Sequence, residues 1–404
     1  MIKEKKFNVL YITVFCIYIN FFIHGIGASI LAQNTKSFQA LWNTNHAAVL
    51  YVISALGIGR FIALPFSGVI SDKFGRRITI IIGMIFYALF FGFIFITPNS
   101  KIGFFVALLA GIANSFLDSG CIPAAMEILV NSTGFASILT KLFISIGQFL
   151  LPMAVGYLAG NNMYFGYSFI FCIILLVING LFLLKLPFPS QEGTKKSDNK
   201  DTTENSDVSA VKSNFFIEGI ALIIIGYTST ATFQIFLNIN KAFGTDIVGL
   251  SESAAGKIQS NYAMGSILAV VITAFLVKKL IKPVRFLFIY PLISLITLIG
   301  MFILRNEAMC LAGGFIIGFS AAGGVLQLAV STMADLFPVS KGKITSMIML
   351  SSSVATFTVT ALAGYITNIF GIEYTLIFAG AVTALGILLS VIVNFRYNII
   401  SKAV

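Results

Sequence analysis

Long apolar stretches separated by short polar ones recur along the whole chain. Each runs for about 20 residues or more, the length that an α-helix needs to cross the hydrocarbon core of a membrane. The stretches are continuous rather than alternating, which excludes a transmembrane β-barrel. We therefore predict an all-α membrane protein of twelve transmembrane helices, at about 9–32, 48–70, 78–97, 103–128, 137–159, 164–186, 215–238, 256–280, 284–304, 308–332, 342–368 and 374–396.

A polar segment separates the sixth predicted helix from the seventh. Residues 189–213 are nearly free of large apolar side chains, so they cannot bury enough surface to fold. We predict two six-helix halves, residues 1–186 and 214–404, joined by a linker over 187–213.

The two halves resemble each other in sequence. Gly111-Ile112-Ala113 aligns with Gly318-Phe319-Ser320 at an offset of 207 residues, and Tyr167-Ser168-Phe169 aligns with Tyr374-Thr375-Leu376 at the same offset. The repeat indicates that helices four to six recur as helices ten to twelve. Two parallel six-helix repeats are typical of secondary transporters, which bind their substrate between the repeats.

Composition and charge narrow the class of protein further. Hydrophobic residues make up 58% of the 404 residues and charged residues only 10%, against about 25% charged residues in soluble proteins. The net charge of +11 does not indicate nucleic-acid binding, because 20 of the 26 Lys and Arg residues fall on one side of the predicted membrane. This bias places both termini and the linker in the cytoplasm.

The loop between the second and third predicted helices carries a specific motif, Gly68-Val69-Ile70-Ser71-Asp72-Lys73-Phe74-Gly75-Arg76-Arg77. Gly68 suits close helix packing, Gly75 suits a tight turn, and Asp72 is an anion able to pair with Arg76 or cap a neighbouring helix. The motif resembles the signature G-x-x-x-D-[RK]-x-G-R-[RK] of the major facilitator superfamily. The resemblance implies a transporter that works as a monomer and a conformational latch formed by Gly68, Asp72, Gly75, Arg76 and Arg77.

Two narrower resemblances point to the kind of transporter. Leu117-Asp118-Ser119-Gly120-Cys121-Ile122-Pro123 resembles the fourth helix of the fucose:proton symporters, where an acidic residue shortly before a Pro carries the proton. Nearly the whole chain is similar to small bacterial inner-membrane transport proteins of the YdiM and YdiN kind, on stretches such as Asn114-Ser115-Phe116-Leu117-Asp118. The resemblances imply a multi-pass protein of the bacterial inner membrane, and they name no firm substrate.

Two charged residues fall near the middle of predicted helices, where a charge is costly and therefore a functional candidate. Asp118 is a candidate proton carrier, and the alternative is a carboxylate fixed in a structural ion pair. Arg60 lies roughly 18 Å from the cytoplasmic end of its helix, at 1.5 Å per residue. It is a candidate to bind a substrate carboxylate through two hydrogen bonds, and the alternative is a partner of Asp118.

Other polar residues in the predicted helices are weaker candidates. His24 is a second candidate for proton coupling, with a neutral packing histidine as the alternative. Lys141 is a candidate ion-pair partner of Glu127 or Asp118, or else it snorkels to the surface. The groups that suit a polar substrate, and that also commonly hold membrane helices together, are Asn20, Asn114, Gln148, Tyr227, Thr230, Gln234, Asn238, Asn261 and Gln327.

Together these residues favour proton-coupled uptake of a small polar solute, such as an organic acid or a sugar-like polyol. Proton-driven efflux of a drug or metabolite is the alternative, and the fifth helix lacks the Gly-Pro motif of drug:proton antiporters. A non-transporting membrane sensor is a remote alternative, because the linker carries no fold signals. No phosphate-binding loop, catalytic triad or metal-ligand cluster occurs in the sequence. We expect no enzymatic activity, metal or cofactor, an ion gradient rather than ATP as the energy source, and a small solute and the lipid bilayer as partners.

Overall fold

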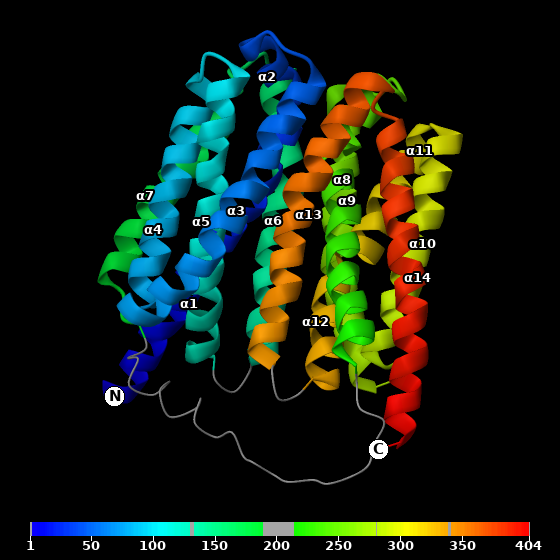
Figure 1. Cartoon of the computed structure of the whole chain (residues 1–404). Helices are drawn as coiled ribbons and strands as arrows, with labels where there is room; N and C mark the ends of the chain where they lie inside the picture. The colour runs from blue at the N-terminus through cyan, green and yellow to red at the C-terminus, as the bar shows by residue number, and fades with distance from the viewer. Residues whose placement is uncertain (1, 130–132, 189–213, 280, 338–340, 404) are drawn as a thin grey trace.

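The computed structural model describes residues 2–129, 133–188, 214–279, 281–337 and 341–403. These residues are almost entirely helical and include twelve helices long and apolar enough to span a membrane. All twelve predicted helices are thereby confirmed. Both chain ends approach the same end of the bundle (Figure 1). We call it the termini end, and we call the opposite end the far end.

The first six spans and the short helix α2 precede residue 189. They are α1 (Ile2–Gln33), α2 (Thr35–Trp42), α3 (His46–Phe74), α4 (Arg76–Phe93), α5 (Ser100–Ile128), α6 (Thr133–Gly160) and α7 (Tyr167–Lys185). The last six spans follow residue 213 and comprise α8 (Ile220–Asp246), α9 (Glu252–Lys279), α10 (Pro283–Leu304), α11 (Glu307–Ile317) with α12 (Val325–Leu336), α13 (Lys341–Ile369) and α14 (Tyr374–Ala403). The linker predicted over 187–213 lies outside the described residues, apart from 187 and 188.

Asparagine residues begin several spans at the far end. The side-chain oxygens of Asn45, Asn99 and Asn306 each accept a hydrogen bond from the backbone N–H three residues on, at 3.0, 3.0 and 2.8 Å. The first N–H groups of a helix have no partner within the helix, so each cap satisfies one of them. These residues therefore fix where α3, α5 and α11 start.

Close helix crossings recur at equivalent places in the two sets of spans. A Cβ added to Gly111 on α5 would overlap the carbonyl of Leu56 on α3, and one added to Gly318 would overlap the carbonyl of Tyr262 on α9. Gly111 and Gly318 are the residues that align in the sequence repeat. Because only glycine lets two backbones approach so closely, the repeat encodes the same crossing twice.

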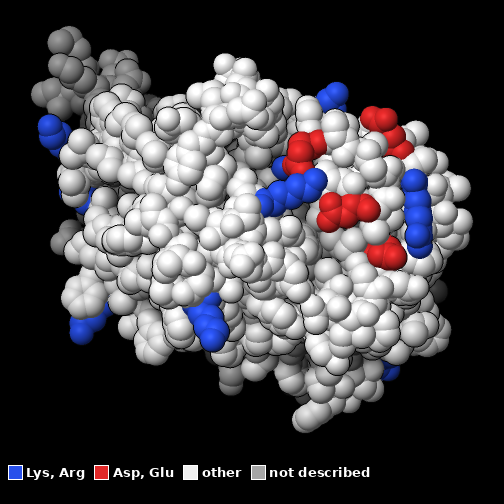
Figure 2. Space-filling view, turned by 90° about the horizontal axis from the view of Figure 1, so that it is seen from above, with Lys and Arg blue, Asp and Glu red and all other residues white. Residues whose placement is uncertain are grey.

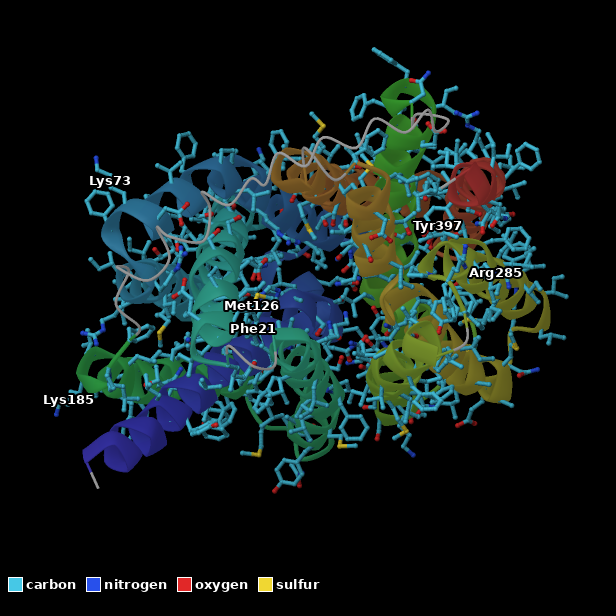
Figure 3. All side chains as sticks on the ribbon, turned by 90° about the horizontal axis from the view of Figure 1, so that it is seen from below. Phe21, Lys73, Met126, Lys185, Arg285 and Tyr397 are labelled. Atoms are coloured by element: carbon cyan, nitrogen blue, oxygen red, sulfur yellow. The ribbon has the colours of Figure 1, made fainter. Side chains whose placement is uncertain are left out.

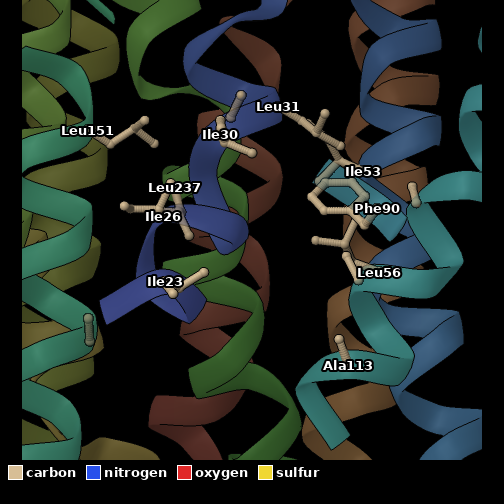
Figure 4. Packing of buried hydrophobic residues seen from close by; sticks show 14 of the residues in the cluster. Ile23, Ile26, Ile30, Leu31, Ile53, Leu56, Phe90, Ala113, Leu151 and Leu237 are labelled. Carbon is tan, nitrogen blue, oxygen red and sulfur yellow. The ribbon is translucent and has the colours of Figure 1, made fainter. Parts of the chain in front are cut away.

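An apolar core runs through both sets of spans. Ile26 on α1, Leu151 on α6 and Leu237 on α8 belong to one buried cluster (Figure 4). Many other large apolar side chains lie on the outside, among them Phe66, Phe105 and Leu388. Burial inside and apolar exposure outside are what a bundle surrounded by lipid requires.

The structure differs from the sequence prediction in two elements. The tenth predicted helix is interrupted by a π-helical turn, Gly318–Ala322, followed by Gly324 at a φ of 126°. That value is accessible chiefly to glycine, so the glycine-rich sequence both packs closely and breaks the helix. The short α2 was not predicted, and it is held by Trp42, whose Nε1 donates to the carbonyl of Thr97 at 3.1 Å.

Candidate functional site

Arg60 and Asp118 form an ion pair between α3 and α5. Nη2 of Arg60 donates to Oδ2 of Asp118 at 3.1 Å, and the two side chains are 25% and 19% exposed. Ser115, one turn before Asp118, donates from Oγ to the carbonyl of Arg60 at 2.8 Å. Nε of Arg60 is buried without a partner among the described residues. Arg60 thus pairs with Asp118, as one prediction had it, and its Nε has no acceptor among the described residues.

Two further titratable side chains lie near this pair. His24 on α1 is within electrostatic reach of Asp118, Arg60 and Lys141, and its Nδ1 is buried without a partner among the described residues. The ring of His24 lies 6.4 Å from that of Tyr87, measured between centroids. The titratable groups predicted from the sequence therefore gather within the first six spans.

Asn114 and Tyr87 extend this polar region. The hydroxyl of Tyr87 on α4 donates to Oδ1 of Asn114, one turn before Asp118. Tyr87 is fully buried and Asn114 nearly so. The sequence prediction included Asn114 but missed Tyr87 and Ser115. Their hydroxyls bond to residues of other helices, Asn114 and the carbonyl of Arg60, and such partners leave no pattern along the chain.

The predicted ion pair between Lys141 and Glu127 is wrong. Nε of Arg76 lies 3.1 Å from Oε1 of Glu127, and Nζ of Lys141 lies 6.0 Å from the centre of the Phe233 ring instead. Glu127 lies in the last turn of α5, at the termini end. Lys141 lies about two turns into α6 and therefore deeper in the bundle, and this difference in depth separates the two charges.

The signature loop forms a hydrogen-bonded network around Arg76. Nη1 of Arg76 lies 2.7 Å from Oδ1 of Asp72 and donates to Oγ of Ser71, also at 2.7 Å. Ser71 in turn donates to the carbonyl of Ser119 at 2.7 Å. That carbonyl lacks its usual helical partner, because the residue four positions on is Pro123, which has no N–H. The proline of α5 and the signature loop are therefore parts of one network.

The glycines of the signature loop play different parts. Gly75 has a φ of 96°, which confirms the predicted tight turn between α3 and α4. The packing role predicted for Gly68 is wrong for the described part of the chain, where nothing lies within 4 Å of a Cβ added there. Arg77 donates from Nη2 to the carbonyl of Leu186 and lies over the ring of Phe188. Arg77 therefore binds the residues that directly follow α7.

Most polar candidates of the last six spans take part in helix–helix contacts. Thr230 donates to Ser352 at 2.9 Å, and Asn238 donates to Thr360 at 3.1 Å, both joining α8 to α13. The amide of Asn261 on α9 donates to the carbonyl of Leu311 at 3.0 Å. These three residues therefore hold helices together, which is the alternative to substrate binding that the sequence analysis gave. The hydroxyl of Tyr227 lies 2.8 Å from that of Thr358.

Two polar candidates of the last six spans keep accessible amides. Gln234, half-buried on α8, donates to Asn238 at 3.3 Å. Gln327 on α12 is exposed. Phe233, next to Gln234, is the residue that Lys141 approaches from the first six spans. This contact places Lys141, a candidate of the first six spans, next to the neighbour of Gln234, a candidate of the last six spans.

Asn20 and Gln148 lie within the packing of the first six spans. Asn20 is fully buried and accepts a hydrogen bond from Nδ2 of Asn179 at 3.0 Å. Its own amide is directed at Sγ of Cys121, 3.9 Å away. Gln148 on α6 is also buried. The amide of Asn20 therefore joins α1 to α5 and α7.

The two sets of spans contact each other at the far end and at mid-depth. Asn45 donates to Asn368 at 3.0 Å between α3 and α13, and Ser260 donates to the carbonyl of Phe149 at 3.0 Å between α9 and α6. A Cβ on Gly57 would overlap the backbone of Phe357. Ser145 on α6 donates to Ser266 on α9 at 3.4 Å near mid-depth. At the far end the two sets are thus in direct contact. This conformation is therefore closed at the far end.

Comparisons with known proteins agree with this architecture. The family model of the Major Facilitator Superfamily matches residues 10–325 and 219–397. The inner membrane transport protein YdiN of Escherichia coli (strain K12) is 39% identical over 398 residues, which cover 98% of this chain and 93% of YdiN. The inner membrane transport protein YdiM of the same strain is 37% identical over 389 residues, covering 96% and 95%.

A solved structure shows the same fold at low sequence identity. The crystal structure of a D-xylose-proton symporter superposes with a TM-score of 0.71 at 14% identity, covering 94% of this chain and 96% of the symporter. The fold predicted from the repeat and the signature loop is therefore confirmed.

Proposed function

Because this chain belongs to the major facilitator superfamily it is a membrane transporter rather than an enzyme, and we propose that it couples uptake of a small polar solute to proton entry. The observation that carries the proposal is the ion pair of Arg60 and Asp118. The pair is joined by a single hydrogen bond of 3.1 Å, and both side chains are partly exposed. A pair of this kind can be opened by a proton or by a competing anion.

Protonation of Asp118 is the first step of the proposed cycle. A proton bound to its carboxylate removes the negative charge that Arg60 neutralises. The guanidinium then offers its N–H groups to another acceptor, and a substrate carboxylate accepts two of them in parallel. Release of the solute returns Arg60 to Asp118, which gives up its proton on the other side. Arg60 therefore binds either the carboxylate of Asp118 or that of the substrate, but not both at once.

Neutral hydrogen-bonding groups support a polar substrate. Tyr227, Gln234 and Gln327 keep partial or full exposure on the last six spans. Amides and phenols suit the hydroxyls and carbonyls of an organic acid or a sugar-like polyol. Thr230, Asn238 and Asn261 are engaged in helix–helix contacts, and the hydroxyl of Tyr227 contacts Thr358 in the same way. We therefore assign selection of the solute to Gln234 and Gln327 together with Arg60. We assign His24 to the proton path, since it lies within electrostatic reach of Asp118.

The charge distribution supports an orientation in the membrane. Lys73 and Lys185 lie at the rim of the termini end, and Arg285 lies at the same end further in (Figure 3). Since short cytoplasmic loops are enriched in Lys and Arg, we place the termini end in the cytoplasm and the far end outside. The relatives YdiN and YdiM are named inner membrane transport proteins, and we assign this chain to the same membrane. We further propose a monomer in the lipid bilayer, driven by the proton gradient without ATP or a cofactor.

Proton movement in proteoliposomes tests the proposal. The purified protein is reconstituted with a pH-sensitive dye inside, and organic acids, sugars and polyols are added outside one at a time. We expect one class of solute to acidify the lumen. Asp118→Asn should abolish acidification because it cannot bind the proton, while Glu307→Gln, an exposed carboxylate at the start of α11, should behave as the parent protein does.

Two outcomes would contradict the proposal. If solute counterflow and acidification both survive in Asp118→Asn, Asp118 is not the proton carrier. If drugs or large apolar metabolites alkalinise the lumen and no small polar solute moves protons, the transporter works by proton-driven efflux.

A further inference from the structure

A cluster of charged side chains ties the two sets of spans together at the far end. Nζ of Lys36 on α2 lies 2.6 Å from Oε1 of Glu252 on α9, and Nζ of Lys241 on α8 lies 2.8 Å from Oε2 of the same carboxylate. Lys241 also donates to the carbonyl of Gln33 on α1 at 2.6 Å. Seen from this end, acidic and basic side chains meet in one part of the face, and the surface around them is largely uncharged (Figure 2).

His46 lines the pocket beneath this cluster. It is the first residue of α3, it is only 9% exposed, and both of its ring nitrogens are buried without a hydrogen-bond partner among the described residues. The pocket is lined by charged residues from α2, α8 and α9 and by neutral ones: Ala32, Thr35, Lys36, Gln39, His46, Lys241, Ala242, Thr245, Asp246 and Glu252. A buried polar ring without partners is unusual in a native structure and calls for an explanation.

The surroundings of His46 accommodate a neutral ring and disfavour a charged one. A protonated imidazole carries two N–H donors, and neither ring nitrogen has an acceptor at hydrogen-bond distance among the described residues. The N-terminus of α3, where His46 stands, has the positive end of the helix dipole. Lys36 and Lys241 add positive charge to the same pocket, and Glu252 is already shared between them.

Among the described residues that line the pocket, Asp246 favours a charged His46 electrostatically. It lies on α8, in the other set of spans, and it is exposed and accepts a hydrogen bond from Thr245 at 2.7 Å. Exposure to solvent weakens its attraction. The burial of a charge without hydrogen bonds therefore outweighs it, and the closed far end requires His46 to be neutral.

We propose that His46 is a proton-binding site of the far-end closure, separate from Asp118, and that its protonation opens that end. Opening exposes the ring to water, where its charge is solvated. Histidine changes charge between about pH 5 and pH 8, so acidification at the far end shifts the transporter toward the far-end-open conformation. The cluster of Lys36, Lys241 and Glu252 holds the closed conformation when His46 is neutral.

Distance measurements between spin labels test the proposal without relying on transport. Labels are attached at Lys101→Cys on α5 and Glu307→Cys on α11, both exposed at the far end. The four native cysteines are buried. In lipid nanodiscs, we expect the ratio of far-end-open to closed protein to rise about threefold or more between about pH 8 and about pH 5.5.

The same pocket offers a matched control, because Gln39 also lines it and is neutral. We expect His46→Gln to remove the pH response and Gln39→Asn to retain it. Asp246→Asn should move the response to higher pH, since it removes the attraction that favours a charged His46 in the closed conformation. The proposal is overturned if the parent protein shows no response, if His46→Gln keeps it, or if Gln39→Asn abolishes it.

A second measurement keeps the proposal testable if His46→Gln does not fold. Imidazole NMR of histidine-labelled parent protein gives two sets of signals, and His24→Gln assigns them. Titration of the His46 signal in parallel with the distance change supports the proposal. Titration of His46 while the distances stay constant overturns it. Because both readouts are conformational, they remain informative if Asp118 is not the proton carrier.

Discussion

Gly59 on α3 and Gly111 on α5 face each other where the two helices cross. A Cβ added to Gly59 would lie 3.2 Å from the Cα of Gly111 and would overlap the carbonyl of Leu108. Arg60 directly follows Gly59, and Asp118 lies about two turns beyond Gly111. The close approach of two backbones therefore brings together the two charges on which the proposed transport cycle depends.

Gly111→Val should disrupt this crossing. Its side chain would overlap the carbonyl of Leu56 and crowd the backbone of Arg60. Overpacking of this kind costs about 1–3 kcal/mol, so we expect a lower unfolding temperature in detergent together with loss of transport. Gly68→Ala is the matched control, because its Cβ meets nothing within 4 Å. An unchanged unfolding temperature for Gly111→Val would show that the helices can separate freely.

Exchange of the two charges separates the structural part of the ion pair from its functional part. Asp118→Asn leaves the charge of Arg60 unpaired, and at this partial exposure we expect a loss of about 1–2 kcal/mol in stability. The double variant Arg60→Asp with Asp118→Arg should recover the unfolding temperature but not transport, because the proton and the solute carboxylate then meet the wrong positions. Full transport by the exchanged protein would mean that the pair serves only to hold α3 against α5.

Asn20 should matter for stability rather than for solute affinity. It is fully buried and accepts a hydrogen bond from Asn179. Nδ2 of Asn179 also donates to the carbonyl of Cys16 at 2.9 Å. Asn20→Ala therefore leaves one of the two N–H groups of Asn179 without an acceptor, which costs about 1–3 kcal/mol. We expect a lower unfolding temperature with the KM for the solute within about twofold of the parent value. A KM raised about tenfold at unchanged stability would place Asn20 in the substrate site, as the sequence alone had predicted.

Glu252→Gln should loosen the far-end closure. The carboxylate binds both Lys36 and Lys241, but the groups are partly exposed, with side-chain exposures from 12% to 57%. Exposed ion pairs contribute at most about 1 kcal/mol each, so we expect the far-end-open fraction to rise about two- to fivefold in the spin-label measurement. The labelled parent protein already lacks one exposed carboxylate at this end, because Glu307→Cys is a label site. It is therefore the control for the loss of an exposed acid.

Much of the fold follows from local patterns along the chain. The length of each apolar stretch predicts a membrane-spanning helix, because backbone groups in lipid must be satisfied within the segment. The sequence also predicts the turn at Gly75 and the glycines shared by the repeats, since both depend on one residue and its immediate backbone. The pairing of Asp72 with Arg76 follows in the same way, from residues one helical turn apart.

Partners from different helices were mostly beyond the sequence, and the pair of Arg60 and Asp118 was one of two alternatives that it left open. The sequence identified Glu127 and Lys141 as charges without showing that Arg76 reaches the first and that the second lies too far along α6. Likewise Asn20, Thr230 and Asn238 carry polar groups suited to a substrate, and only the packing of neighbouring helices directs them into contacts with Asn179, Ser352 and Thr360.

The sequence by itself determined that this protein crosses the membrane twelve times, as two related sets of helices with charges buried in the first. Hydrophobic length, loop charge and glycine spacing are local properties, and they suffice for that. The tertiary structure decided which charges meet and which end of the bundle is closed. It joined Arg60 to Asp118, and among the described residues it gave neither ring nitrogen of His46 a hydrogen-bond partner. Both outcomes depend on helix crossings between residues far apart in the chain.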